Sequence, residues 1–354
     1  MNMRVTTTGV LKSYQTNLMH ASNTLNSARN TVLTQRNFNS FAEDPASATQ
    51  AFQLRRSFLR VNSQSAVSSS LVGKFEAGWS ALTSVQSITK NALSDVLEAK
   101  NDPTASGLNA LGTDLEQLAQ SIVQTMNTKY GENFVFAGAD GLNVPFELKE
   151  DANGVMQLYY RGVLVDSPEK NADGTANPDY ETLKYLSGEE SFLDIGLGMQ
   201  EGVDDNLIES SAYNESLPGI NYLGGYGVDE DGDPKNVVSI MYRMADLLKN
   251  CSADGEWQGD DKAEFDRLAG KFEAAVDNVS VSYVELDSQA RFVKDNDLQL
   301  ETTAYNLNEQ ILGLEQVDLA DAISSYSWAQ YCYNAALKMG NSILGQSLMD
   351  YIST

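Results

Sequence analysis

Hydrophobic residues recur at every seventh position through a long stretch of the C-terminal half of the chain. Each seventh residue from Phe265 to Leu314 is apolar, and a companion row that begins at Ala269 is interrupted at Asp297. This spacing is typical of a helix that packs against partner helices in a left-handed supercoil. We therefore predict one unbroken helix of roughly 75 Å, whose core row is Phe265, Phe272, Val279, Leu286, Val293, Leu300, Leu307 and Leu314.

The N-terminal part of the chain carries shorter apolar stripes with the same helical spacing. They run through residues 11–32, 67–96 and 108–122. Any one of these stripes could be the core face of an ordinary helical bundle, but the row of eight apolar positions spaced by seven implies partner helices. The flanks of the chain therefore predict an elongated helical rod built from N-terminal and C-terminal coiled-coil segments.

The middle of the chain has a different pattern. Turn signals rich in Asp, Asn and Gly separate short runs of β-branched and aromatic residues at positions 155–160, 162–165 and 191–196, which we expect to be strands. The predicted fold class is thus mainly α, with a β-rich module inserted at residues 139–235.

Composition narrows the range of functions. The formal charge is −25, of which −16 falls on residues 139–235. Such an acidic surface repels phosphate groups, so we expect no nucleic-acid partner and no membrane partner. The chain has one histidine, His20, which excludes an HExxH zinc site, and its two cysteines lack a metal-binding spacing. We predict no catalytic, cofactor or metal site.

One acidic turn has the closely spaced carboxylates of a possible calcium site, because Asp229, Asp231 and Asp233 fall within five positions. A calcium-binding EF-hand that began at Asp229 would need glycine where Pro234 stands and glutamate where Ile240 stands. We therefore expect a solvated acidic turn rather than a calcium site.

The two ends of the chain predict contacts with other subunits. Residues 322–354 contain a single basic and a single acidic residue, and their apolar side chains surround much of the helix. Such a helix must be buried on more than one face, and the N-terminal helix cannot cover all of it. We predict an assembly interface formed by Leu11, Leu18, Leu25, Leu337, Leu344, Leu348 and Tyr351.

Short motifs support this interpretation. Residues 39–48 read NSFAEDPASA and include Asp44 and Pro45, residues 158–162 read LYYRG, and residues 347–352 read SLMDYI. These segments resemble the bacterial flagellin superfamily, and more closely its hook–filament junction branch, although Gln35 stands where that family usually has glycine. A further segment with the same resemblance contains Asn127, Phe136, Gly138, Pro145 and Phe146.

The resemblance implies three parts: residues 1–40 with 316–354 in an inner-tube layer, 41–138 with 236–315 in a helical rod, and 139–235 as an exposed outer module. It implies export of the unfolded chain by the flagellar type III apparatus, which fits a start without an apolar signal region, and an extracellular location in the flagellum. The implied partners are further copies in a ring, a hook-side junction protein (hook-associated protein 1), flagellin and an export chaperone.

The sequence leaves three possible roles. The leading one is a structural subunit that joins the flagellar hook to the filament. A filament flagellin is the alternative, and the third is a secreted adhesin or glycosidase whose acidic module acts while the helices anchor it.

Overall fold

The computed structural model describes residues 7–101, 104–152, 154–171, 173–202, 207–251 and 257–352, and it gives only the backbone for residues 7, 8, 105 and 342–352. The chain forms two compact units. The terminal unit comprises Met1–Asn62 with Thr302–Thr354, and the central unit comprises Ser63–Glu301. Two long helices, α2 (Pro45–Asn101) and α6 (Asp261–Glu315), supply residues to both units.

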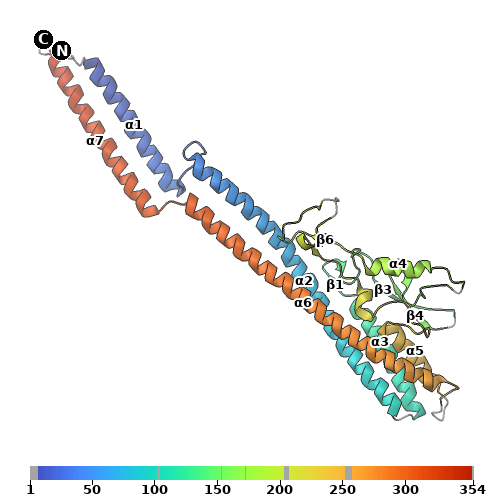
Figure 1. The fold of residues 1–354 in the computed structure, drawn as a ribbon. Coiled ribbons are helices and arrows are strands. Elements are labelled where there is room, and N and C mark those ends of the chain that lie inside the picture. Colours follow the sequence, from blue (N-terminus) through green and yellow to red (C-terminus); the bar gives the residue numbers. More distant parts are fainter. Residues whose placement is uncertain are drawn as a thin grey trace. The chain divides into compact units, whose positions relative to one another are not determined.

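The terminal unit is built on a pair of antiparallel helices, α1 (Thr7–Thr34) and α7 (Leu319–Ile352), which lie side by side (Figure 1). A glycine allows one close contact between them: a Cβ atom added at Gly340 would lie only 1.9 Å from the Tyr14 hydroxyl oxygen. The loop after α1 is tied to the end of α6, because the Asn37 side-chain amide donates to the carbonyl oxygens of Leu314 and Gln316, each at 3.0 Å.

The last turn of α1 ends in a strained residue. Gln35 has φ = 54°, and its N–H donates to the Thr31 carbonyl at 2.8 Å. A left-handed residue after a helix is usually glycine, because a Cβ atom is unfavourable there. Gln35 therefore occupies a position at which glycine would be less strained.

We expect Gln35→Gly to stabilise the terminal unit by about 1 kcal/mol, because glycine removes the steric strain of the left-handed conformation. Thermal unfolding followed by circular dichroism measures the change. Thr34→Gly is the matched control, since Thr34 is helical and glycine there should destabilise. Equal effects of the two substitutions would contradict this explanation.

The central unit has its core along α6. Phe265, Phe272, Val279, Leu286 and Val293 of the predicted row are all buried. The prediction of an unbroken helix is confirmed, since α6 continues for 55 residues. The polar interruption at Asp297 is satisfied by the Ser65 hydroxyl of α2, which donates to its carboxylate at 3.1 Å. Leu300 is also buried, whereas Leu307 and Leu314, which belong to the terminal unit, are half-buried.

The rest of the central unit surrounds this core. Helix α3 (Ala105–Met126) packs against α5 (Val237–Lys249). Three small antiparallel sheets lie between them in sequence: β1 (Lys129–Tyr130) with β2 (Asn133–Phe134); β3 (Phe146–Glu150), β4 (Met156–Tyr160) and β5 (Val163–Leu164); and β6 (Phe192–Leu193) with β7 (Tyr213–Asn214).

The predicted fold class is confirmed, and the three expected strands correspond to β4, β5 and the shorter β6. The middle segment also contains elements that we did not predict. These are strands β3 and β7, helix α4 (Pro178–Ser187) and two 3₁₀ turns at Glu209–Ser211 and Gly219–Leu223. Helix α4 begins at a recognisable cap, since the Asn177 side chain accepts from the Asp179 N–H and Pro178 occupies the first turn.

Candidate assembly surface and its supporting motifs

The motif at Asp44 and Pro45 is the start of helix α2. The Asp44 carboxylate accepts from the backbone N–H groups of Ala46 and Ser47, each at 3.1 Å, and Pro45 is the first helical residue. Hydrogen bonds from the side chain and backbone of Ser47 hold the pKa of Asp44 below its ordinary value. The motif therefore acts locally as a helix cap.

The motif at Asn127 and Phe146 joins a helix to a sheet. Asn127 follows α3, and its side-chain amide donates to the Phe146 carbonyl at 2.9 Å while its side-chain oxygen accepts from the Phe146 N–H at 3.1 Å. The Phe146 ring is buried against the Tyr160 ring, with 5.0 Å between centroids, and Pro145 is buried beside it. One amide thus fixes where β3 begins relative to α3.

Phe136 and Gly138 belong to the same junction. The Phe136 carbonyl accepts from the Tyr160 hydroxyl at 3.1 Å and from the Gly219 N–H at 2.9 Å. Gly138 has φ = 74°, and a Cβ atom there would lie 2.7 Å from a carboxylate oxygen of Glu189. The structure thus brings together the motif positions from 127 to 146, and it gives each of them a part in the local packing.

Arg161 supports this junction and was not singled out from the sequence. It has φ = 50° in the turn between β4 and β5, where Asn, Asp or Gly is usual. Its guanidinium pairs with Glu189 at 2.6 Å and with Asp140 at 3.8 Å. A bulky residue directly before Gly162, between two runs that are predicted to be strands, is the sequence signal that could have identified it.

The expectation of a solvated acidic turn is wrong for Asp233. Its carboxylate is fully buried and accepts from Arg267 of α6 at 2.7 and 3.0 Å, while Lys271 and Arg243 lie 2.6 and 3.1 Å away. Lys271 is also 2.6 Å from Asp229 and 2.8 Å from Asp231. An ammonium group therefore occupies the centre of the three carboxylates, where a metal ion would otherwise have to bind.

The physical reason for this error lies in α6. Arg267 and Lys271 are spaced i, i+4, so both cations lie on one face of the helix and meet the turn. The hydrogen bonds from Arg267 lower the pKa of Asp233 to about 2. Two cations spaced i, i+4 on the polar side of α6 are the sequence signal that could have predicted that the acidic turn at Asp229–Asp233 binds to this helix.

Three other carboxyl groups, those of Asp95, Asp166 and Asp246, have a pKa that is shifted in the opposite direction, and the pKa of Asp246 is raised by burial and by the nearby Glu116. Burial raises the pKa of Asp95 to about 6, and the facing Asp114 carboxyl of α3 adds to the shift. Burial likewise raises the pKa of Asp166 to about 6, although the Asn236 side-chain amide donates to it at 2.7 Å.

These shifts predict a stability maximum at mildly acidic pH. As the pH falls from 8 through 6, the folded protein takes up protons at Asp95 and Asp166 before the unfolded chain does (ordinary pKa about 3.9), so stability rises. Below about pH 4 the unfolded chain is protonated at the position of Asp233 while the folded protein is not, so stability falls. Thermal midpoints measured from pH 3 to 8 should therefore peak between about pH 4 and 6. Asp95→Asn should flatten the upper limb, and a midpoint that rises steadily from pH 4 to 8 would contradict the account.

The terminal unit exposes more of its large hydrophobic side chains than it buries. Among the described side chains it buries five hydrophobic residues, three of which are alanine: Ala51, Val61, Ile311, Ala322 and Ala329. Fourteen large hydrophobic residues of the same unit are exposed: Val10, Leu11, Met19, Leu33, Phe41, Phe52, Leu59, Tyr305, Leu319, Ile323, Trp328, Tyr331, Leu337 and Met339. No described helix is both long and apolar enough to cross a membrane.

The predicted interface residues lie on this unit. Leu11 and Leu337 are exposed, and Leu18 and Leu25 are half-buried. The side chains of Leu344, Leu348 and Tyr351 lie outside the described residues, although the α7 backbone that carries them is described. The assembly interface remains a prediction, and its described members retain surface that another chain could cover.

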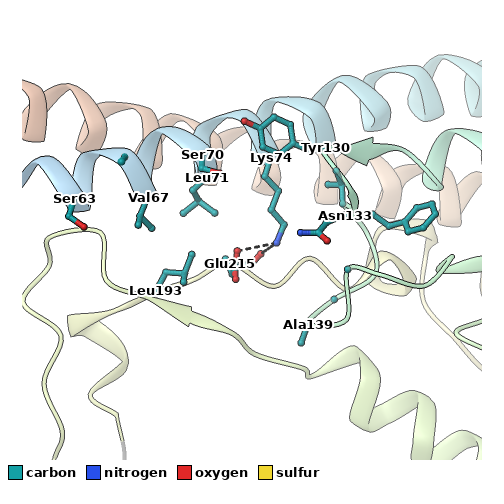
Figure 2. A pocket seen from close by; sticks show the side chains of 15 residues that line it. Ser63, Val67, Ser70, Leu71, Lys74, Tyr130, Asn133, Ala139, Leu193 and Glu215 are labelled. Atoms are coloured by element: carbon teal, nitrogen blue, oxygen red, sulfur yellow. Dashed lines mark hydrogen bonds and ion pairs between the residues drawn. The ribbon is translucent and has the colours of Figure 1, made fainter.

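A pocket of about 480 Å³ in the central unit lies between α2 and the sheet-bearing segment (Figure 2). Leu71 and Leu193 belong to its lining, and the Lys74 ammonium group donates to the Glu215 carbonyl at 2.9 Å and lies 3.3 Å from its carboxylate. Glu215 is the one carboxylate among its described lining residues. Glycoside hydrolysis generally uses two carboxylates, so the pocket does not have the residues of a glycosidase site.

Comparison with solved structures shows the fold. A structure assigned to a flagellar hook-associated protein of Vibrio parahaemolyticus matches with a TM-score of 0.54 and 15% sequence identity, covering 77% of this chain and 99% of that one. FlgL of Bacillus cereus matches with a TM-score of 0.42 and 18% identity over 75% of this chain and 99% of that one. Hook-associated protein-3 of Legionella pneumophila matches with a TM-score of 0.44 and 12% identity over 73% and 98%.

No protein-family model and no curated protein matches the sequence. The match to the Vibrio structure shows that the chain has the fold of that flagellar hook-associated protein.

Proposed function

We propose that this protein is a structural subunit of the bacterial flagellum that joins the hook to the filament, in the role of a hook-associated protein 3. The observation that carries the proposal is the small core of the terminal unit, in a chain whose fold matches that of a flagellar hook-associated protein. Among its described side chains, this unit exposes fourteen large hydrophobic residues and buries five hydrophobic residues, three of which are alanine, so it is stabilised when other chains cover it.

The proposed partners follow from the same surface and from the resemblance to the flagellin superfamily. Copies of the chain associate in a ring through their terminal helices. A hook-side junction protein (hook-associated protein 1) and flagellin bind on opposite sides of this ring. The acidic middle segment, residues 139–235, faces water, in keeping with its charge of −16.

Export completes the proposal. The chain travels unfolded through the flagellar type III apparatus, and an export chaperone binds the apolar C-terminal helix before assembly by helix-in-groove contacts. We assign no catalytic residue, cofactor or metal to the protein. In the pocket beside α2, Lys74 is paired with Glu215, and in the Asp233 cluster the Lys271 ammonium group lies among the three carboxylates.

Deletion of the gene tests the proposed role. Without a junction subunit, hooks should form but filaments should not remain attached to them, and expression of the full chain should restore both attachment and swimming. Cells that lack the protein yet carry normal attached filaments would overturn the proposal. Cells with hooks that carry a normal junction but no filament shaft would instead favour a filament flagellin.

A further inference from the structure

We propose that an aromatic knob on α7 of one copy of this chain seats in an aromatic groove at the start of α2 of a neighbouring copy. The knob is the pair Trp328 and Tyr331. The groove lies among Phe38, Phe41, Phe52 and Arg55. The inference rests on the proposed self-association and names the contact that would hold neighbouring copies together.

The knob is prominent in the isolated chain. Trp328 is 68% exposed and Tyr331 is 67% exposed, although their rings stack on one another at 5.9 Å between centroids. Residues spaced i, i+3 lie on the same face of a helix, so the two rings form one surface. Each such ring can bury about 150–250 Å² in an interface, and Trp and Tyr are enriched among the residues that dominate binding.

The groove has the complementary shape and chemistry. It has a volume of about 520 Å³ and lies entirely within the terminal unit. Phe41 and Phe52 line it and are 63% and 69% exposed. Arg55, held by an ion pair with Glu315, lines the same groove, and a guanidinium group can pack on the face of an incoming indole ring.

Charge favours a second copy as the occupant. The charged residues between positions 316 and 337 are both acidic: Asp318, directly before α7, and Asp321 in its first turn. Beyond the groove, α2 continues with Arg56 and Arg60, which are exposed. When the knob enters the groove, these opposite charges can meet at the rim and favour the correct register.

The geometry also sets the type of assembly. The knob and the groove are different surfaces of the same unit, and both stay exposed within one chain. A contact between two different surfaces is head-to-tail, and repeated contacts of this kind close into rings or continue as helices. The proposed pair is therefore suited to a ring of subunits rather than to a closed dimer.

Disulfide trapping tests the contact directly, because the exposed native Cys332 follows Tyr331. Two full-length proteins of different tag size are mixed, both carrying Cys251→Ser. The groove partner carries Ser40→Cys and Cys332→Ser, and the knob partner keeps Cys332. Ser40 lines the groove. Each protein then contains a single cysteine, so neither can form a disulfide within its own chain. Mild oxidation should give a mixed disulfide dimer.

The controls decide the outcome. We expect at least tenfold more mixed dimer than with Ser94→Cys, an exposed position of α2 in the central unit, in place of Ser40→Cys. Trp328→Ala with Tyr331→Ala in the knob partner should reduce the yield at least tenfold. A yield no higher than that of the Ser94→Cys control, or one unaffected by loss of the two rings, would overturn the proposal. The cross-link reports the contact and gene deletion reports the cellular role, so either can fail without the other.

Discussion

Replacing Leu18 and Leu25 together by alanine is expected to abolish assembly while leaving the central unit as stable as before. Both side chains are half-buried in the isolated chain, so most of their remaining burial would come from neighbouring subunits. Losing a fully buried leucine side chain costs about 2–5 kcal/mol, and the part of this cost that comes from burial by neighbouring subunits weakens association by about tenfold for each 1.4 kcal/mol.

The measurement combines filament attachment in cells with thermal unfolding of the purified protein. Val284→Ala is the matched control, because Val284 is 61% exposed and belongs to the central unit. If the double variant attached filaments normally, or if Val284→Ala impaired attachment as strongly, the assignment of the assembly surface to the terminal helices would be wrong.

The second large effect is expected at Asp233. Asp233→Ala should lower the free energy of unfolding by about 2–4 kcal/mol, because it removes a buried carboxylate that pairs with Arg243, Arg267 and Lys271 at once. This loss is smaller than the roughly 3–5 kcal/mol that breaking a fully buried ion pair costs. The reason is that Arg243, Arg267 and Lys271 keep some contact with water, which screens their charges.

Asp231 offers a control within the same turn. It also pairs with Lys271, but its side chain is 62% exposed, so Asp231→Ala should cost less than about 1 kcal/mol. Urea denaturation of both variants at pH 7 gives the comparison. Equal losses would mean that the buried cluster does not anchor the turn to α6.

The helical part of the fold could be predicted because its signal is periodic and long. The row from Phe265 to Leu300 repeats in steps of seven, and a repeat of that length leaves few alternatives to a long packed helix. The residues of the row that lie in the central unit are buried, and the interruption at Asp297 is paired with Ser65.

The middle segment was harder to predict, because contacts between distant residues decide its structure. Asp233 looks like its exposed neighbours in the sequence, and its burial depends on Arg267 and Lys271, which lie more than thirty positions away. Helix α4 had a local signal in Asn177 and Pro178, which the surrounding turn residues obscured.

The candidate site could be predicted in kind but not in detail. Apolar ends with few charges indicated a surface for other subunits, and the described side chains of Leu11 and Leu337 are exposed on it. The groove at Phe41 and Phe52 could not be predicted, because its lining combines the loop after α1, the start of α2 and Glu315 of α6, which are far apart in the sequence.

The position of the protein along the flagellum is the most direct test of the account. Immunogold labelling of intact flagella with an antibody against residues 139–235, viewed by electron microscopy, measures it. The account predicts a narrow band of label where the hook meets the filament. Label along the whole shaft, or label absent from flagella, would contradict it.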